Sequence, residues 1–444
     1  MSSLRTRLGR LTVPTAGGVP APVPEPALPE APPAPEALGQ GVRGDLDRMR
    51  TRGRARRSAP GWEHVARGPR VHELPGATHL TEHGELHVVE HRCALEQQHG
   101  ARAIKAARTV DADVVATLAL DPQMRGLDFS RALYIDTETT GLMGGTGTVP
   151  FLIGTAAFEG EQLVVRKLML RRLGEEAPML HALAEQLREA SCVVSFNGKS
   201  FDWPLLRTRF VMNRVKAPPV PPHLDLLHCA RRVFKGRMER VRLVDIEREV
   251  LGFQRVDDVA GSEIPGLYMA YLRGGDAAPI ARIIEHNRLD LIALAALLAE
   301  LVGQFAGLGA EEDPRDKLAC ARVAERAGDA GLARALASAA VLTHGQGANA
   351  AEAWLLHARV ARREGDVDRE EQALLSAVLS LEGSPDGAGQ ATPLTHAHVH
   401  LALAKLYERK RKDPERALPH ARLTVPAEDE DQAARRLARL TRRV

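Results

Sequence analysis

Apolar and polar residues alternate with two different periods between residues 131 and 306, and this pattern predicts a mixed α/β domain. Short apolar segments with strand periodicity are separated by amphipathic segments with helical periodicity. The expected strands are ALYIDTE, PFLIGTAAFEG, EQLVVRKLMLRR and SCVVSFNG, and the expected helices are APMLHALAEQLREA, FDWPLLRTRF, DLLHCARRVF, RLVDIEREVLGF and residues 278–305. Residues 61–130 show strand patterns at 66–74 and 85–92 and a helical pattern at 106–120. We interpret them as a flanking N-terminal element of the same domain.

Beyond residue 313 the pattern becomes purely helical and repeats itself. The segment ARVAERAGD begins at Ala321, and a similar segment, ARVARREGD, begins 37 residues later at Ala358. A looser copy, AKLYERKRKDP, begins at Ala404. A helix, a short turn and a second helix at this period resemble tetratricopeptide (TPR) repeats, so residues 313–444 are predicted to form TPR-like helical repeats. An irregular helical bundle is the alternative.

Composition sets limits on the remaining residues and on the compartment. Residues 1–60 are predicted to be a disordered arm, because 13–38 consist mainly of Pro, Ala and Glu. The basic cluster Arg48–Arg57 that follows is either a solvated helix end or a hold on nucleic acid phosphates. Four cysteines without a Cys-x-x-Cys pair favour reduced thiols and a cytoplasmic protein. The apolar run Leu291–Val302 is too short to cross a bilayer, so no membrane partner is expected.

The most informative motif is DTETTGL, which places two carboxylates at the end of an expected strand. Asp136 and Glu138 are two residues apart, so their side chains point to the same face of the sheet. Neighbouring carboxylates repel and raise each other's pKa unless a cation lies between them. The pair therefore indicates either a proton-sharing dyad or a site for a hard divalent metal.

Two further segments supply acids that would complete such a site. SFNGKSFDWPLL carries Asn197, Phe201 and Asp202 where an expected strand passes into a helix, although an acid at a helix start is also a common cap. EHNRLDLIAL carries His286 and Asp290 four residues apart, hence on one face of the long expected helix. Taken alone, this pair would be an ordinary surface hydrogen bond.

Together the three segments resemble the DnaQ-like exonuclease superfamily of the ribonuclease H fold, in which four acids hold two metal ions. A closer resemblance is to the bacterial YprB-like family of ribonuclease-H-like exonucleases with TPR repeats behind the catalytic domain. The residues that carry it are DTETTGLMGGTGTVPFLIG, HLDLLHCARR, LGFQRVDDVAGSEIPGLYMAYLR and HNRLDLIAL. The chain departs from that family in having His286 where a tyrosine is expected.

The resemblance implies a ribonuclease H-like mixed sheet flanked by helices at 131–306, and a role for each residue of the motifs. Asp136, Glu138, Asp202 and Asp290 would hold two Mg²⁺ or Mn²⁺ ions, and His286 would orient or deprotonate the attacking water. The implied substrate-binding residues are Thr139, Thr140, Gly141, Leu142, Asn197 and Phe201. For the four residues from Thr139 to Leu142, a plain turn after the strand is the alternative. Asp225 is either a helix cap or a group that supports the metal ligands.

The resulting hypothesis is a metal-dependent 3′–5′ exonuclease acting on nucleic acid, with DNA favoured over RNA, in repair or processing. The helical repeats would recruit a protein partner, and the resemblance suggests a helicase. A non-catalytic nucleic-acid-binding adaptor with a TPR scaffold is the alternative from another class. An RNA-trimming exonuclease would share the site and differ in its tolerance of the sugar 2′-hydroxyl.

Overall fold

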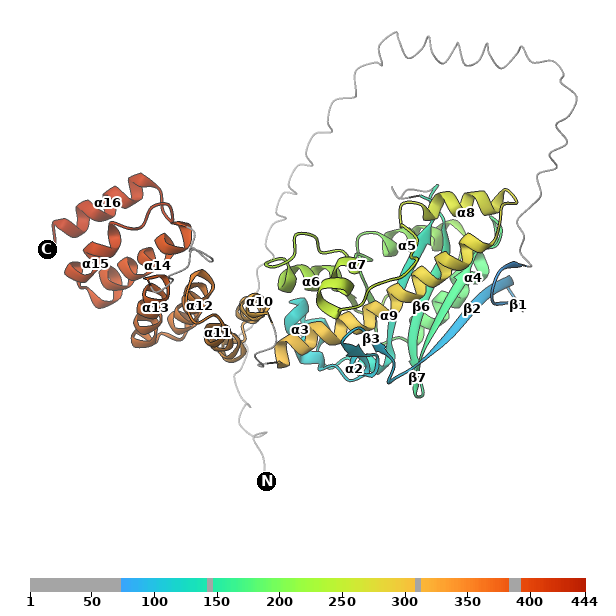
Figure 1. Cartoon of the computed structure of the whole chain (residues 1–444), viewed down its shortest axis with the longest axis horizontal. Helices are drawn as coiled ribbons and strands as arrows, with labels where there is room; N and C mark the ends of the chain where they lie inside the picture. The colour runs from blue at the N-terminus through green and yellow to red at the C-terminus, as the bar shows by residue number, and fades with distance from the viewer. Residues whose placement is uncertain (1–72, 142–146, 308–312, 383–392) are drawn as a thin grey trace, which may run out of the picture. The chain divides into compact units, whose positions relative to one another are not determined.

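The computed structural model describes residues 73–141, 147–307, 313–382 and 393–444 (Figure 1). The proline-rich arm, the basic cluster Arg48–Arg57 and Leu142 lie outside these residues. So does most of the strand expected at 66–74, of which the described Glu73 and Leu74 are not in a strand.

The centre of the fold is a seven-stranded mixed sheet with the strand order β1-β2-β7-β6-β5-β8-β9. β5 pairs antiparallel with β6 and parallel with β8, and β8 continues parallel to β9. β6 and β7 are antiparallel, and β2 and β1 extend the sheet beyond β7 with antiparallel pairing. The strands are β1 Ala77–Thr81, β2 Gly84–Ala94, β5 Ala132–Thr139, β6 Pro150–Glu159, β7 Gln162–Met169, β8 Cys192–Ser195 and β9 His223–Asp225. The short strands β3 (Gln98–His99) and β4 (Arg102–Ala103) form a separate two-stranded sheet.

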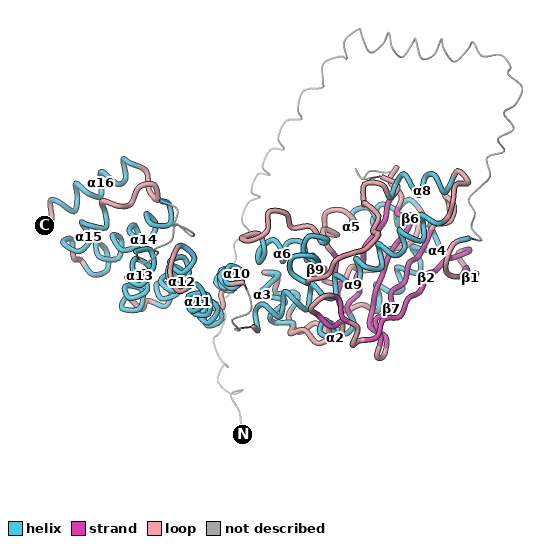
Figure 2. Tube along the Cα trace, in the orientation of Figure 1, coloured by secondary structure: helices cyan, strands magenta, loops and turns pink. Residues whose placement is uncertain are grey.

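Helices cover both faces of the large sheet, because its central strands are apolar on both sides. In β5, Tyr134 belongs to one core and its neighbours Leu133 and Ile135 belong to the other. The helices of this part are α2 Lys105–Arg108, α3 Ala112–Ala119, α4 Glu176–Glu189, α5 Asp202–Met212, α6 Leu226–Phe234, α7 Leu243–Ile246, α8 Ile264–Leu272 and α9 Ala278–Ala306, with a π-helical turn at Glu247–Leu251. Figure 2 shows these helices around the strands of the sheet.

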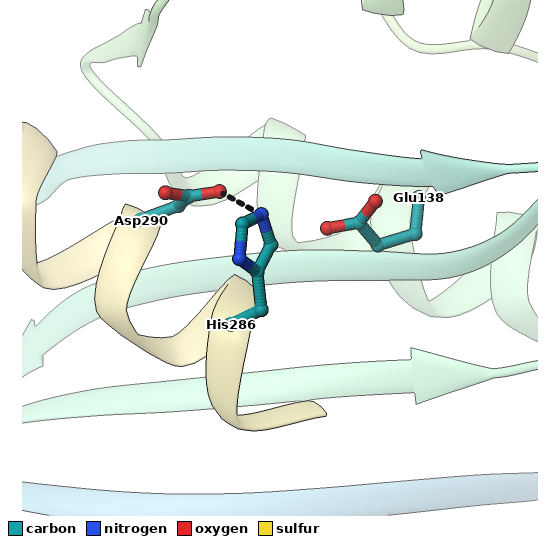
Figure 3. A group of neighbouring side chains, drawn as sticks. All are labelled: Glu138, His286 and Asp290. Atoms are coloured by element: carbon teal, nitrogen blue, oxygen red, sulfur yellow. Dashed lines mark ion pairs between the residues drawn. The ribbon is translucent and has the colours of Figure 1, made fainter. Parts of the chain in front are cut away.

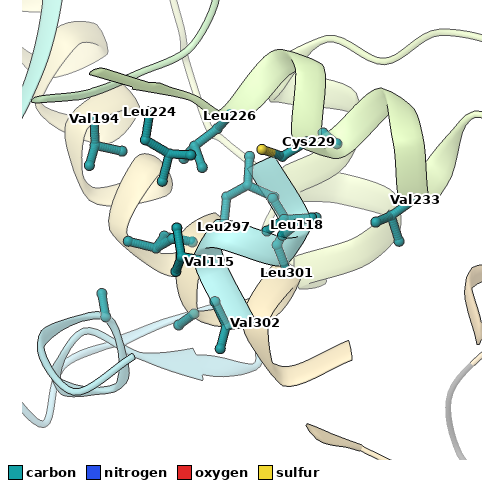
Figure 4. Close-up of a cluster of buried hydrophobic side chains, with 14 of the residues drawn as sticks. Val115, Leu118, Val194, Leu224, Leu226, Cys229, Val233, Leu297, Leu301 and Val302 are labelled. Atoms are coloured by element: carbon teal, nitrogen blue, oxygen red, sulfur yellow. The ribbon is translucent and has the colours of Figure 1, made fainter. Parts of the chain in front are cut away.

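The long helix α9 packs across β5, β6 and β7 and contributes to both cores. Its C-terminal half meets α3 and α6 in the first core, where Leu297 and Leu301 lie among Val115, Leu118 and Leu226 (Figure 4). By length and composition α9 could cross a membrane, but most of its apolar stretch is buried inside the fold. The helix is therefore buried as a core element is, and its packing on the sheet holds its polar residues near β5.

Three sequence expectations need correction. The helix expected at 106–120 is broken into α2 and α3, because Asp111 accepts hydrogen bonds from Asp113 N and Val114 N and so begins a new helix. The helix expected at 242–253 is the short α7 followed by the π-helical turn, and it ends at Gly252 with φ 68°. Helix α8 was missed, because its apolar residues lie on all sides rather than on one face.

The C-terminal part consists of helix pairs joined by short turns: α10 Pro314–Ala327 and α11 Ala330–His344, α12 Ala348–Glu364 and α13 Val367–Glu382, and α14 Pro393–Leu406 and α15 Pro414–Ala421, followed by α16 Glu430–Thr441. A π-helical turn, Tyr407–Arg411, extends α14. Each copy of the sequence repeat falls on a turn within a pair. Gly328, Gly365 and Lys412 take the left-handed conformation that ends the first helix of each pair.

We propose that the α/β domain ends with α9 and that the TPR-like repeats begin with α10. The first helices of the three pairs, α10, α12 and α14, line a groove of about 370 Å³.

Candidate metal centre

Asp136 and Glu138 lie at the C-terminal end of β5, on the face of the sheet that α9 covers. The register between β5 and β6 shifts directly after Glu138, so regular pairing changes at the carboxylates. Burial, together with the charges of Asp290, Glu138 and Asp202, raises the pKa of Asp136 well above its usual value. Burial and the charges of Asp290 and Asp202 also raise the pKa of Glu138 to about 7. Acids from three separate segments of the chain therefore lie close enough to hinder each other's ionisation.

Asn287 of α9 holds Asp136 in place. Its Nδ2 donates to Oδ2 of Asp136 over 2.8 Å, and the side chain of Asn287 is fully buried. Its Oδ1 has no hydrogen-bond partner among the described residues. The amide can approach the strand because Gly154, opposite Asp136 on β6, has no side chain. A Cβ at residue 154 would lie 1.9 Å from Oδ1 of Asn287.

We expect Gly154→Ala to disturb the site through Asn287. The added methyl must displace a buried amide, which typically costs about 1–3 kcal/mol of stability. Loss of the Asn287 hydrogen bond should also lower cation-dependent activity about 10-fold or more. Thermal unfolding and turnover would be compared with Gly261→Ala, whose added Cβ would meet nothing within 4 Å. Equal effects of the two substitutions would contradict the anchoring role of Asn287.

Asp202 begins α5, the helix that follows β8, and β8 pairs with β5 in the sheet. Thr137 donates through Oγ1 to Oδ1 of Asp202, and the side chain of Asp202 is buried. Burial raises the pKa of Asp202 to about 6, although the hydrogen bond from Thr137 opposes that rise. Thr137 was missed at the sequence level, because it lies between the two acids of β5 and alternation places it on the other face.

Asp225 organises the loop that precedes Asp202. Its carboxylate accepts from Asn197 N over 2.8 Å and from Lys199 N over 3.1 Å. It also accepts from Leu227 N over 3.1 Å and so caps α6. Asp225 is thus a helix cap that also binds the backbone of the segment leading to Asp202, and its support of metal ligands stays a prediction.

His286 and Asp290 lie one turn apart on α9 and face Glu138 (Figure 3). Nε2 of His286 lies 3.4 Å from Oδ2 of Asp290, and its Nδ1 lies 2.6 Å from Oδ1 of Asp258. Burial would lower the pKa of His286, but the charges of Asp290 and the hydrogen bond to Asp258 outweigh it and raise that pKa. The side chain of His286 is only 12% exposed, which does not fit an ordinary surface histidine.

The expected substrate-binding residues border the site at the described positions. Thr139 donates to Gly141 O over 2.8 Å, and Thr140 Oγ1 accepts from Val149 N over 3.0 Å. Both hydroxyls therefore shape the turn after β5. Asn197 has a left-handed backbone with φ 67°, and Phe201 precedes α5.

The donor set fits divalent cations. Glu138, His286 and Asp290 each offer one ligand atom, and these atoms lie within 4.8 Å of one another. Asp136 and Asp290 each have one carboxylate oxygen held by a protein donor, Asn287 Nδ2 and Arg255 NH2, respectively. Their other oxygens point to no hydrogen-bond donor in the part of the chain that the structure describes, apart from His286 beside Asp290. A cluster of carboxylate oxygens that resists ionisation without a counter-ion suits Mg²⁺ or Mn²⁺.

Sequence comparisons relate the α/β part of the chain to known proteins. Residues 133–302 match the RNase_H superfamily, so this part of the chain is an RNase H-like domain. The chain is also similar to the uncharacterized protein YprB of Bacillus subtilis (strain 168), with 34% identity over 175 residues, or 39% of this chain and 42% of that protein. The similarity thus spans less than half of the relative. RNase H-like domains usually bind divalent metals, which agrees with the candidate ligands Glu138, His286 and Asp290.

Proposed function

We propose that this protein is a metal-dependent exonuclease that removes nucleotides from the 3′ end of DNA. One observation carries the proposal: Asp136, Glu138, Asp202 and Asp290 converge from three segments at the end of β5, with His286 beside them. RNase H superfamily membership of residues 133–302 supports the nuclease class.

Asp136, Glu138, Asp202 and Asp290 would hold two divalent cations, which supply Lewis acidity for phosphodiester hydrolysis. The residues of the chain have separate tasks around that chemistry. Asn287 fixes Asp136, and Thr137 fixes Asp202, so the carboxylates need little reorganisation when substrate binds. Nε2 of His286 faces the acids, where it would orient the attacking water and accept its proton.

Degradation of end-labelled oligonucleotides tests this function. DNA and RNA of one sequence would carry the label at either end and be incubated with Mg²⁺, Mn²⁺ or EDTA. We expect 5′-labelled DNA to shorten stepwise and 3′-labelled DNA to release a labelled mononucleotide at once, only with a cation. An Asp290→Asn preparation purified in parallel controls for contaminating nucleases.

Each other pattern identifies a competing function. Early mononucleotide release from the 5′ label would reverse the polarity, and faster degradation of RNA would favour the RNA-trimming enzyme. Binding of the strands without turnover in either metal would favour the non-catalytic adaptor.

A further inference from the structure

A largely exposed loop, whose Val259 is buried in the core, sends two charged side chains into the candidate site. It connects the π-helical turn to α8, and its Val256 is 82% exposed. The neighbouring Arg255 has a side chain that is only 3% exposed, and that of Asp258 is 20% exposed. Neither residue belongs to the acids that the sequence motifs single out.

Arg255 meets three carboxylates from three parts of the chain. NH2 donates to Oδ1 of Asp290 over 2.5 Å and lies 2.7 Å from Oε2 of Glu247, while NH1 lies 3.1 Å from Oδ2 of Asp258. Glu247 is itself fully buried and bonded to Nε2 of His99 over 2.8 Å. Glu247, itself held by His99, therefore fixes the guanidinium of Arg255. The guanidinium cannot turn away from Asp290 without leaving buried charges unpaired.

Asp258 determines which nitrogen of His286 faces the acids. Its Oδ1 lies 2.6 Å from Nδ1, a distance at which the ring nitrogen donates its proton to the carboxylate. Nε2 is then left on the side of Asp290 and Glu138. Because Arg255 also binds Asp258, the orientations of His286 and Asp290 are linked through one side chain.

We propose that Arg255 and Asp258 are positioning residues of this site: Arg255 orients Asp290 toward the cations, and Asp258 orients His286 toward the attacking water. This inference rests on the proposed nuclease function. Arg255 occupies one oxygen of Asp290, so the other is directed inward. Asp258 contacts His286 directly and reaches Asp290 only through Arg255, so its loss should disturb His286 more than the cation ligands.

If the hydrogen bonds of Arg255 and Asp258 served only to attach the loop to α9, they would not need to involve Asp290 and His286. The loop has a separate fastening to α9, in which Arg282 donates to Asp257 O over 3.1 Å. Arg282→Met therefore removes a different arginine that joins the same loop to α9, without altering a contact of the acids, and it serves as the matched control.

The test combines Mn²⁺ binding by titration calorimetry with steady-state kinetics of the full chain. We expect Arg255→Met to weaken Mn²⁺ binding about 10- to 100-fold and to lower kcat, as for other groups that orient metal ligands. Arg255→Lys keeps one charge but lacks the planar fork, so it should fall between Arg255→Met and wild type. Asp258→Asn should lower kcat about 10-fold or more with KM and Mn²⁺ affinity changed less than about 3-fold. Arg282→Met should match wild type.

The outcomes separate this inference from the proposed function. Assays are run below the melting temperature of each variant. If the wild type is active and the Arg255 and Asp258 variants keep its kcat and Mn²⁺ affinity, the positioning roles alone are overturned. An inactive wild type that binds Mn²⁺ would overturn the nuclease function, and calorimetry would still decide the role of Arg255. A wild type that binds no Mn²⁺ would overturn both.

Discussion

Asp136→Asn is expected to reduce cation-dependent hydrolysis by at least about 10³-fold while stabilising the metal-free protein at pH 8. Removing a single group that stabilises developing charge commonly costs 10²- to 10³-fold, and the charges of Asp290, Glu138 and Asp202 all act on Asp136. The same substitution removes a charge whose ionisation the fold opposes, so the metal-free protein should unfold at a higher temperature. Turnover of labelled DNA and thermal unfolding in EDTA measure the two effects.

The opposite directions of these effects make the prediction specific. A substitution that merely damaged the fold would lower both activity and melting temperature. The matched control is Asp111→Asn, which keeps the cap of α3 because asparagine caps helices about as well as aspartate. Near-wild-type hydrolysis by Asp136→Asn would contradict its assignment as a metal ligand.

The sequence predicted the parts of the fold that depend on local periodicity. Strands β5 to β8 and the long helix α9 follow from apolar patterns within a few residues. The addition of β2 to the sheet beside β7 could not be predicted, because nothing in residues 84–94 specifies a partner that is 68 to 82 residues away. The break between α2 and α3 depends on a single aspartate cap, which a helical pattern read over a longer window conceals.

The residues of the site also differ in whether a local sequence pattern could predict them. Strand alternation places Asp136 and Glu138 on one face, and helical spacing does the same for His286 and Asp290. The resemblance to DnaQ-like exonucleases joined these two pairs to Asp202. Arg255 and Asp258 lie in an irregular loop and reach α9 through contacts that span 35 and 28 residues, respectively. Asn287 and Gly154 illustrate a further limit, because the glycine matters only through the amide that packs against it. A local pattern has no signal for such a pair.

Metal-free wild type is expected to lose stability as the pH rises from about 4 to about 7, and Mn²⁺ is expected to restore it. In the folded protein the pKa of Glu138 is raised to about 7 and that of Asp202 to about 6, against ordinary values of 4.5 and 3.8. Between those limits the folded protein binds more protons than the unfolded chain, so the free energy of unfolding falls with rising pH. Each pKa unit corresponds to about 1.4 kcal/mol, so a melting temperature lower by a few degrees at pH 8 than at pH 5 is expected in EDTA.

Cations should act in the opposite sense, because they replace the protons that the acids hold at low pH. Mn²⁺ at millimolar concentration should therefore raise the melting temperature more at pH 8 than at pH 5. Buried Asp316, whose pKa is raised to about 7 by burial, contributes a slope of the same sign outside the site. His223, whose pKa is lowered to about 4 by burial, contributes one of opposite sign.

The decisive quantity is thus the difference between wild type and Glu138→Gln, since the contributions from Asp316 and His223 are common to both. The variant should show a smaller loss of stability between pH 5 and pH 8 in EDTA and a smaller gain with Mn²⁺ at pH 8. Parallel curves for the two proteins, with the same Mn²⁺ response, would mean that Glu138 neither resists ionisation nor binds the cation. A reduced pH slope with an unchanged Mn²⁺ response would instead place the cation on the three aspartates without Glu138.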